Sequence, residues 1–362
     1  MPQTKPTDFT SDFSVMKQYA GLASQGKGLI GVLLPDTTTS TRYVQYDAPL
    51  LTKALQTAGL GSSDIKVDNA HGSASTMQTQ AEADINAGAS VLLIDGIDSS
   101  SGAAIASKAE SQGVKVIDYD RLNTGGPADR YYVSFNNVTV GKTMGQGFVD
   151  CVTAWKVQKP NVLIMDGDPT DNNAKLFAQG YDGVLAPHFA DGSYVKVADP
   201  AGTWDPSTAA TIFQQQYTAH PNINSAITAN DDKANAVIAI LKSNNIAANT
   251  FPLTGQDASL PGLQNILTGF QCGTVYKPIY LEAQAAAALA IDLRAGVTPP
   301  SSLVGATTQD STLNKPIPSV YTVPVWVTTD NMADTVVKDG TVKTSDLCAG
   351  AVASACTKYG IS

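Results

Sequence analysis

The stretch SVLLIDGIDSSSGAAIASKAESQGVKVIDYDR, residues 90–121, contains two short β-rich runs with a helix-like segment between them. The run VLLI is continuously apolar instead of alternating, as expected of a strand that is buried on both faces. Residues 102–112 carry apolar side chains at helical spacing. Strand, helix and strand in this order are the repeating unit of parallel sheets. The stretch therefore predicts an α/β fold.

The same alternation continues on both sides of this stretch, with five strand-like runs before Asn137 and five after it. Further helical segments are expected at 47–58, 75–87, 208–219 and 280–296. The expected strands are 28–34, 65–70, 90–95, 114–120, 131–135, 161–168, 194–199, 225–230, 251–257 and 273–277. A chain of 362 residues is also longer than one hydrophobic core usually serves. We therefore expect two doubly wound, Rossmann-like lobes of similar size.

The end of the chain adds one more strand-like run at 320–327 and a last helix near 331–338. This arrangement indicates a chain that passes between the lobes more than once, through a hinge of several strands. The expected division, which follows these segments, is a polar leader outside the fold at 1–27, a first lobe at 28–133 and 277–308, a second lobe at 134–276 and 309–345, and a carboxyl-terminal extension at 346–362.

Composition excludes two classes of function. A formal net charge of -9 leaves no basic surface for phosphates, so nucleic acid is not an expected partner. No apolar run approaches the ~20 residues that span a bilayer, so we expect no membrane-spanning segment. The first residues lack the basic start and apolar stretch of a signal peptide, so either none exists or it was removed.

Four cysteines, Cys151, Cys272, Cys348 and Cys356, form no CxxC pair and have no nearby histidine, so zinc is not expected. An even number of cysteines suits disulfides in an extracytoplasmic protein. The eight-residue separation of Cys348 and Cys356 suits a small closed loop, and Cys151 with Cys272 is the remaining pair. Four buried free thiols are the alternative.

Polar residues follow the predicted strands, where ligands bind in open α/β sheets. In the first half these are Asp36, Arg42, Tyr43, Asp120 and Arg121. In the second half they are Asn172, Trp204, Asn230 and Asp257. Carboxylates, amides and guanidinium groups can pair with sugar hydroxyls, and the C–H faces of a sugar pack on aromatic rings such as Tyr43 and Trp204.

Most of these residues also have a structural alternative. Arg42 and Arg121 could form ion pairs at the surface. Asp36, Asp120 and Asp257 could cap helices, and so could Asn172 and Asn173. Trp204 could be lobe packing, the expected role of Trp155 and Trp326. No nucleophile elbow is present, and His71, His188 and His220 lie away from the polar edge, so no catalytic residue, metal site or cofactor is expected.

From about residue 28 to 340 the chain resembles the periplasmic xylose-binding proteins of ABC sugar importers. The resemblance rests on six segments in matching order, VIDYDR (116–121), YYVSFNNVTVGK (131–142), DNNAKLFAQG (171–180), ITANDD (227–232), LTGQDASLPGL (253–263) and TVYKPI (274–279).

The resemblance implies a type I periplasmic binding protein fold that closes on one monosaccharide, xylose or a similar pentose or hexose, and delivers it to a permease. It implies the ligand residues Arg42, Arg121, Asn172, Trp204, Asn230, Asp257 and Lys277, to which Tyr43 is added as an aromatic platform. It also implies a monomer that is not an enzyme and lies outside the cytoplasm, with any lipid anchor in a removed leader. A sugar sensor that docks on a chemoreceptor or histidine kinase is the alternative.

Overall fold

The computed structural model describes residues 2–361, which form two compact units. The first unit consists of Met1–Asn136, Thr170–Asn173 and Ile279–Val323. The second consists of Asn137–Pro169, Ala174–Pro278 and Pro324–Ser362.

The first unit is built on a seven-stranded sheet of order β10-β11-β5-β4-β3-β1-β2. All neighbouring strands are parallel except β10 and β11, which pair antiparallel. The bounds are β1 Leu29–Leu34, β2 Ile65–Asn69, β3 Ala89–Ile94, β4 Lys115–Tyr119, β5 Tyr131–Phe135, β10 Ala306–Asp310 and β11 Lys315–Thr322. Parallel order brings the carboxyl ends of β1, β3, β4 and β5 to one edge of the sheet.

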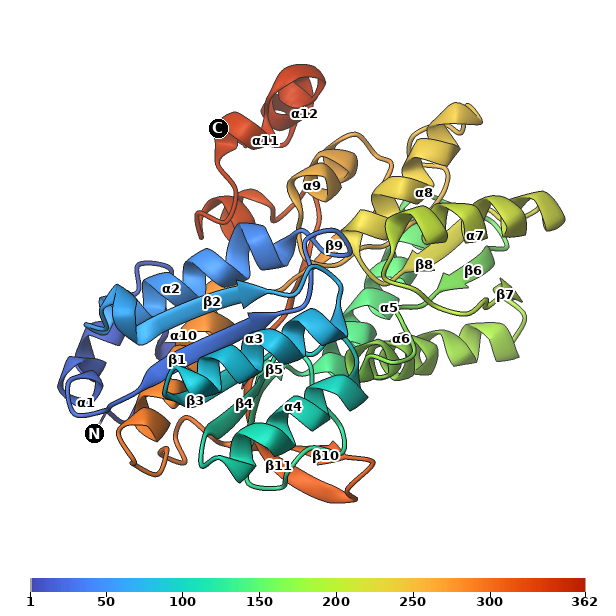
Figure 1. The fold of residues 1–362 in the computed structure, drawn as a ribbon. Coiled ribbons are helices and arrows are strands. Elements are labelled where there is room, and N and C mark those ends of the chain that lie inside the picture. Colours follow the sequence, from blue (N-terminus) through green and yellow to red (C-terminus); the bar gives the residue numbers. More distant parts are fainter. Residues whose placement is uncertain (1, 362) are drawn as a thin grey trace. The chain divides into compact units, whose positions relative to one another are not determined.

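Helices cover both faces of this sheet (Figure 1). Helices α2 (Ala48–Thr57) and α10 (Ile279–Arg294) contribute to one core, which includes the buried Val32 and Val91. Helices α3 (Ala74–Asn86) and α4 (Ser99–Ser111) contribute to the other, which includes Leu33. Because both faces are covered, the strands of the interior are apolar on both sides, as VLLI predicted.

The prediction that residues 1–27 form a leader outside the fold is wrong. These residues form the helical turns η1 (Pro6–Asp8) and η2 (Ser14–Tyr19) and the short helix α1 (Ala20–Ala23). Phe9, Phe13, Met16 and Tyr19 are buried in the core shared with α2 and α10. Apolar residues at spacings of three and four make this segment one-sided, so it packs despite its polar average composition.

The second unit has a three-stranded parallel sheet, β7-β6-β8, and an antiparallel pair of β12 and β9. The bounds are β6 Asn161–Met165, β7 Val195–Ala198, β8 Ser225–Thr228, β9 Thr274–Tyr276 and β12 Val325–Val327. Residues 251–257 form no strand, only single parallel bridges from Leu253 to Ala226 and from Gln256 to Val275.

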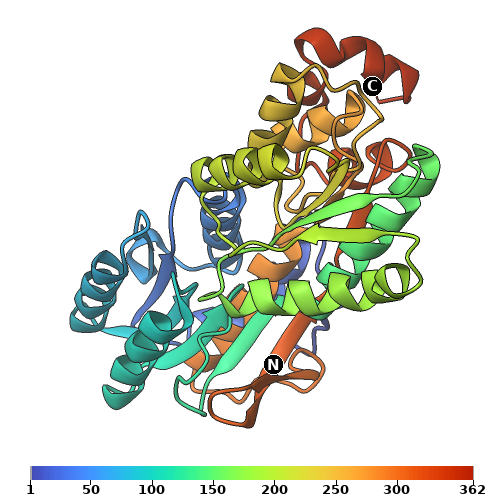
Figure 2. The same cartoon turned by 90° about the vertical axis from the view of Figure 1, so that its right-hand side faces the viewer.

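The helices of the second unit are α5 Asn137–Ala154, α6 Asn172–Ala190, α7 Pro206–Ala219, α8 Asp231–Ser243, α9 Leu260–Leu267, α11 Thr344–Leu347 and α12 Ala353–Lys358. Helix α6 starts in the segment Thr170–Asn173 of the first unit and continues in the second. Helix α11 lies beside α9, where Gln264 Nε2 donates to the carbonyl of Leu347 at 3.3 Å (Figures 1 and 2). The last helix expected near 331–338 is confirmed as the short π-helix η5 (Ala333–Val337).

Several boundaries differ from those expected. Residues 134–136 belong to the first unit and residues 277–278 to the second, the reverse of the expected division. The hairpin of β10 and β11 belongs to the first unit, whereas residues 309–323 were assigned to the second. Strand β11 pairs with β5 through four residues, which fixes it to the first sheet. Residues 346–362 belong to the second unit and are not a separate extension, since Leu347 and Cys356 are buried in its core.

Both expected disulfides are confirmed within the second unit. Cys151 of α5 pairs with Cys272, 121 residues away. Cys348 pairs with Cys356 of α12 across the expected eight residues. The first bond fastens α5 near the start of β9, and the second closes the carboxyl-terminal turn.

Candidate functional site

In the first unit the guanidinium group of Arg42, after β1, is surrounded by three carboxylates. Nε and Nη2 donate to the two oxygens of Asp47 at 2.9 and 2.7 Å. Nη1 donates to Asp120 at 2.9 Å, and Nη2 also donates to Glu282 at 3.0 Å. Four of the five N–H groups of an arginine are therefore used by carboxylates. We call Arg42, Asp47, Asp120 and Glu282 the Arg42 cluster.

Arg42 keeps its charge although it is buried. Burial lowers the pKa of Arg42, but Asp120 and Asp47 outweigh it and hold that pKa above its ordinary value. The hydroxyl of Tyr119 donates to Asp47 at 2.6 Å. With three carboxylates to one guanidinium, the cluster carries an excess of acceptors, which suits hydroxyl donors.

Arg121 is the second guanidinium at this edge, and it contacts the ring expected to be a platform. Its Nη2 donates to the Tyr43 hydroxyl at 2.9 Å, and its Nε lies 3.2 Å from Asp171 and 3.5 Å from Asp95. Tyr43 is only 2% exposed and belongs to the apolar core of the first unit, and the guanidinium groups of Arg42 and Arg121 lie 5.5 and 5.7 Å from its ring centre. The ring is thus held by two cations.

Asp120 occupies a backbone conformation that few residues adopt. Its φ is 56°, and its carbonyl accepts bonds at 2.8 Å from Tyr132, Ser134 and Asn173. Three donors on one carbonyl hold the turn that aims the Asp120 carboxylate at Arg42. Strain of this kind is concentrated at functional sites.

The segment Thr170–Asn173 lies with the first unit, so the prediction that Asn172 belongs to the second lobe is wrong. Its neighbours make the attachments. The backbone of Ser99 donates to Thr170, Asp171 pairs with Arg121, and Asn173 bonds to Asp120. Charge pairing and hydrogen bonding thus attach this segment to the first unit, although β6 before it and most of α6 after it belong to the second.

In the second unit, Trp204 lies where the chain folds back beside the end of β6. A Cβ atom on Gly167 would stand 2.3 Å from the indole, so only glycine allows the ring this close. Phe177 of α6 meets the indole edge to face, with ring centres 6.5 Å apart. The ammonium group of Lys233 lies 5.0 Å from the Trp204 ring centre. The indole is therefore fixed on several sides by groups of its own unit.

Asp257 follows residues 251–256 and also has unusual backbone angles. Its φ is 92° and that of Ala258 is 53°. Asp257 pairs with Lys277 at 3.3 Å, and Lys277 lies 5.9 Å from the centre of the Phe177 ring. The structure thus brings Asp257, Lys277 and the Phe177–Trp204 pair to one edge of the second unit.

Asp231 supports the turn at Asp257 from below. Its carboxylate accepts bonds from the backbone of Ser259 at 2.8 Å, from Gln271 at 2.8 Å and from Thr274 at 2.9 Å. Burial raises the pKa of Asp231 to about 7 against these donors. Asn230 caps α8, and its side-chain oxygen accepts from the backbone of Lys233 at 3.0 Å.

A family model described as a periplasmic binding protein domain matches residues 30–297. The D-xylose-binding periplasmic protein of Escherichia coli is 34% identical over 308 residues, which cover 84% of this chain and 88% of that protein. The chain belongs to the periplasmic binding protein family.

Solved structures agree with this assignment. A carbohydrate transporter solute-binding protein from Chloroflexus aurantiacus, in complex with D-glucose, has a TM-score of 0.78 and 28% identity, covering 88% of this chain and 98% of that one. An ABC transporter solute-binding protein from Clostridium phytofermentans, with bound β-D-glucose, has a TM-score of 0.77 and 26% identity, covering 88% and 99%. The fold of this periplasmic binding protein is the type I fold, as expected.

Several residues at these edges were not expected from the sequence of this binding protein. Lys233 stands directly after the NDD that follows β8, so the strand-end rule could have found it. Glu282 lies inside the alanine-rich helix α10, where no local signal marks it. The remaining residues of this kind are Asp47, Asp95, Asp171, Asn173 and Phe177.

The structural alternatives had mixed outcomes. Asp36 accepts bonds from the backbone of Thr38 and Thr39 at 2.7 and 2.8 Å, so it holds a turn rather than a long helix. Trp326 packs against Gly147 and Gly273, where an added Cβ would stand 2.2 and 2.5 Å from the indole. The packing role expected of Trp326 is therefore confirmed.

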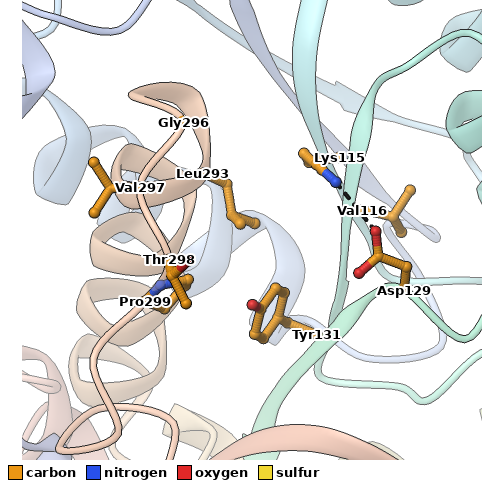
Figure 3. Close-up of a pocket in the computed structure, with 9 residues that line it drawn as sticks. All are labelled: Lys115, Val116, Asp129, Tyr131, Leu293, Gly296, Val297, Thr298 and Pro299. Carbon is orange, nitrogen blue, oxygen red and sulfur yellow. Dashed lines mark hydrogen bonds and ion pairs between the residues drawn. The ribbon is translucent and has the colours of Figure 1, made fainter.

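A cavity of about 280 Å³ opens at the other edge of the first sheet, near the first residues of β4 and β5 (Figure 3). Lys115 and Asp129 form an ion pair at 3.1 Å on one side of it, and Leu293 and Pro299 lie on the opposite side. None of the residues expected to bind ligand lines it.

Two features are absent from residues 2–361. No helix there is long and apolar enough to cross a bilayer. No group of three or more His, Cys, Asp or Glu side chains in that range is arranged to hold a metal ion.

Proposed function

We propose that this chain is the extracytoplasmic binding component of an ABC sugar importer and that its ligand is a monosaccharide, xylose or a closely related pentose or hexose. The Escherichia coli relative is named for D-xylose, and the two solved relatives hold glucose. Both solved relatives are described as transporter proteins, which favours delivery to a permease over the alternative role as a sensor.

The observation that carries this proposal is the edge of the second unit, where an aromatic pair stands beside a carboxylate–ammonium pair. An indole can accept the apolar face of a sugar ring. Asp257 and Lys277 can accept from and donate to its hydroxyls. The proposed ligand residues are Arg42, Tyr43, Arg121, Asn172, Trp204, Asn230, Asp257 and Lys277.

The pairing seen in the first unit refines the expected role of Arg42. Since four of its N–H groups serve carboxylates, we propose that Arg42 chiefly orients Asp120, which then accepts sugar hydroxyls. A site built this way discriminates against ligands that lack hydroxyls, because its buried polar groups would stay unpaired.

A thermal-shift panel of monosaccharides tests the proposed ligand class. A sugar at 100 times its dissociation constant adds about 2.7 kcal/mol of apparent stability. The panel contains xylose and glucose, which differ by one hydroxymethyl group. Its control is a compound without sugar hydroxyls, such as a carboxylic acid of similar size. Stabilisation by no sugar of the panel would contradict the proposal.

We propose further that binding leaves the sugar unchanged, as befits a carrier and not an enzyme. Incubating the best sugar with the protein and recording its proton NMR spectrum over a day tests this. The spectrum should remain that of the added sugar, and a new anomeric or open-chain signal would contradict it.

We propose an extracytoplasmic location and a monomeric state. The two disulfides support the location, because structural disulfides persist mainly outside the reducing cytosol. Alkylation of natively exported protein without reductant should label no thiol, and labelling of Cys348 or Cys356 would contradict the location. Light scattering should give the mass of one chain.

A further inference from the structure

Lys233 is a buried lysine that was not among the predicted site residues. It lies in the first turn of α8 with 0% of its surface exposed. Its ammonium group donates to the carbonyls of Met165 at 3.0 Å and Asp166 at 2.7 Å. The same ammonium group lies over the Trp204 ring, 5.0 Å from the ring centre. Among the described residues no carboxylate forms an ion pair with it.

These contacts join two loops that carry the indole. The carbonyl of Asp166 accepts from Lys233 and also from the backbone of Thr203, at 3.1 Å. A Cβ on Gly202 would stand 1.9 Å from the carbonyl oxygen of Gly167, so the two loops touch backbone to backbone. Lys233 therefore fastens the end of β6 to the loop that presents Trp204.

We infer that Lys233 is a positioning residue for Trp204. The charge state of Lys233 sets the orientation of the indole against a bound sugar. The ammonium form both bonds the two carbonyls and attracts the face of the ring. The neutral amine keeps carbonyl bonds but loses that attraction. The predicted effect of Lys233 on sugar binding rests on the proposed function, whereas its predicted effect on the orientation of the indole does not.

The charge of Lys233 is poised to change near neutral pH. Burial lowers the pKa of Lys233 to about 7, opposed by the nearby Asp166. Asp166 itself is engaged by the hydroxyl of Tyr181, and Asp199 and Asp182 are the further acidic groups that act on it. Burial also raises the pKa of Asp166. A pH experiment must therefore distinguish the titration of Asp166 from that of Lys233.

Indole N–H resonances of the full chain test the inference directly, because the protein contains three tryptophans. Trp204→Phe assigns the resonance of Trp204. We expect that resonance to shift with a midpoint within about one unit of pH 7, while those of Trp155 and Trp326 stay constant. Lys233→Met should abolish the shift, and Asp166→Asn should preserve it.

Two results would overturn the inference. One is a Trp204 resonance that does not move between pH 6 and 9 in the parent. The other is a shift that persists in Lys233→Met or, if that variant does not fold, in Lys233→Gln, which keeps a donor without the charge.

Calorimetry with the best sugar adds the functional arm. At pH 6 we expect Lys233→Met to bind about threefold to tenfold more weakly than the parent, and at pH 9 the difference should be smaller, because the parent has then also lost the attraction to the ring. Equal affinity at pH 6 would overturn the effect on sugar. If no sugar binds the parent at all, the proposed function fails, while the indole titration still decides the role of Lys233.

Discussion

Arg42 in the first unit and Lys233 in the second are both buried cations, but they are balanced in different ways. Arg42 lies among three carboxylates at 2.7 to 3.0 Å. Within residues 2–361, the partners of the Lys233 ammonium group are two backbone carbonyls and an indole ring. The first arrangement keeps its charge over the whole physiological range, whereas the second can lose it near pH 7.

The difference follows from the chemistry of the two side chains. A guanidinium group is planar, stays protonated in proteins and matches carboxylates in pairs. An ammonium group is a compact charge whose pKa falls readily on burial. We therefore expect the Arg42 cluster to stabilise the first unit at all physiological pH values, and the contribution of Lys233 to depend on pH.

The largest effect is expected from Arg42→Met, which leaves Asp47, Asp120 and Glu282 without their cation. Removing one partner of a buried charge network costs about 3 to 5 kcal/mol. Urea unfolding of the sugar-free protein at pH 7 measures this loss in the free energy of unfolding.

Two variants give this experiment its controls. Lys115→Met breaks the ion pair with Asp129, whose partners are 50% and 73% exposed, and should cost less than about 1 kcal/mol. Arg42→Lys keeps the charge without the fork and should fall between the two. A loss for Arg42→Met no greater than that for Lys115→Met would break the comparison.

A smaller, pH-dependent effect is expected from Lys233. Its pKa is about 7 in the folded chain against the ordinary 10.5, so between these values the unfolded chain binds one more proton. The free energy of unfolding contributed by Lys233 should therefore rise with pH above 7, by up to about 1.4 kcal/mol per unit.

Unfolding curves at pH 7, 8 and 9 for the parent and Lys233→Met test this sign. The difference between the two proteins should change steadily with pH, because the variant lacks the titrating group. At pH 7 the variant should lose less than half of what Arg42→Met loses. A constant difference across the three pH values would show that Lys233 does not titrate in this range.

The sequence predicted the sheets well because buried parallel strands are marked by short apolar runs. It failed where pairing decides the structure. Residues 251–257 resemble a strand but form only two bridges. The hairpin of β10 and β11 joins the first sheet through β5, which precedes it by more than 170 residues in the sequence. Phe9 and Phe13 are buried although the segment that contains them is polar on average.

The candidate site shows the same division. Strand-end position predicted which residue types gather at each edge, but not their partners. Arg42 and Glu282 are 240 residues apart, and nothing near Glu282 indicates the contact. Tyr43 was expected as an aromatic platform, yet this residue is only 2% exposed and lies near two guanidinium groups. Partner choice depends on tertiary packing, which local patterns do not contain.

The most direct test of the account is the affinity of Asp257→Ala for the best sugar of the panel, measured by titration calorimetry at pH 7. A carboxylate that accepts sugar hydroxyls through charge-assisted bonds contributes about 1.5 to 3 kcal/mol for each. We therefore predict at least tenfold weaker binding, measured well below the unfolding temperature of the sugar-free variant, which should be lower than that of the parent because buried Lys277 loses this carboxylate. Asp334→Ala, which removes an exposed carboxylate of the same unit, should bind like the parent. Equal affinity of Asp257→Ala and Asp334→Ala would contradict the assignment of this edge as the sugar site.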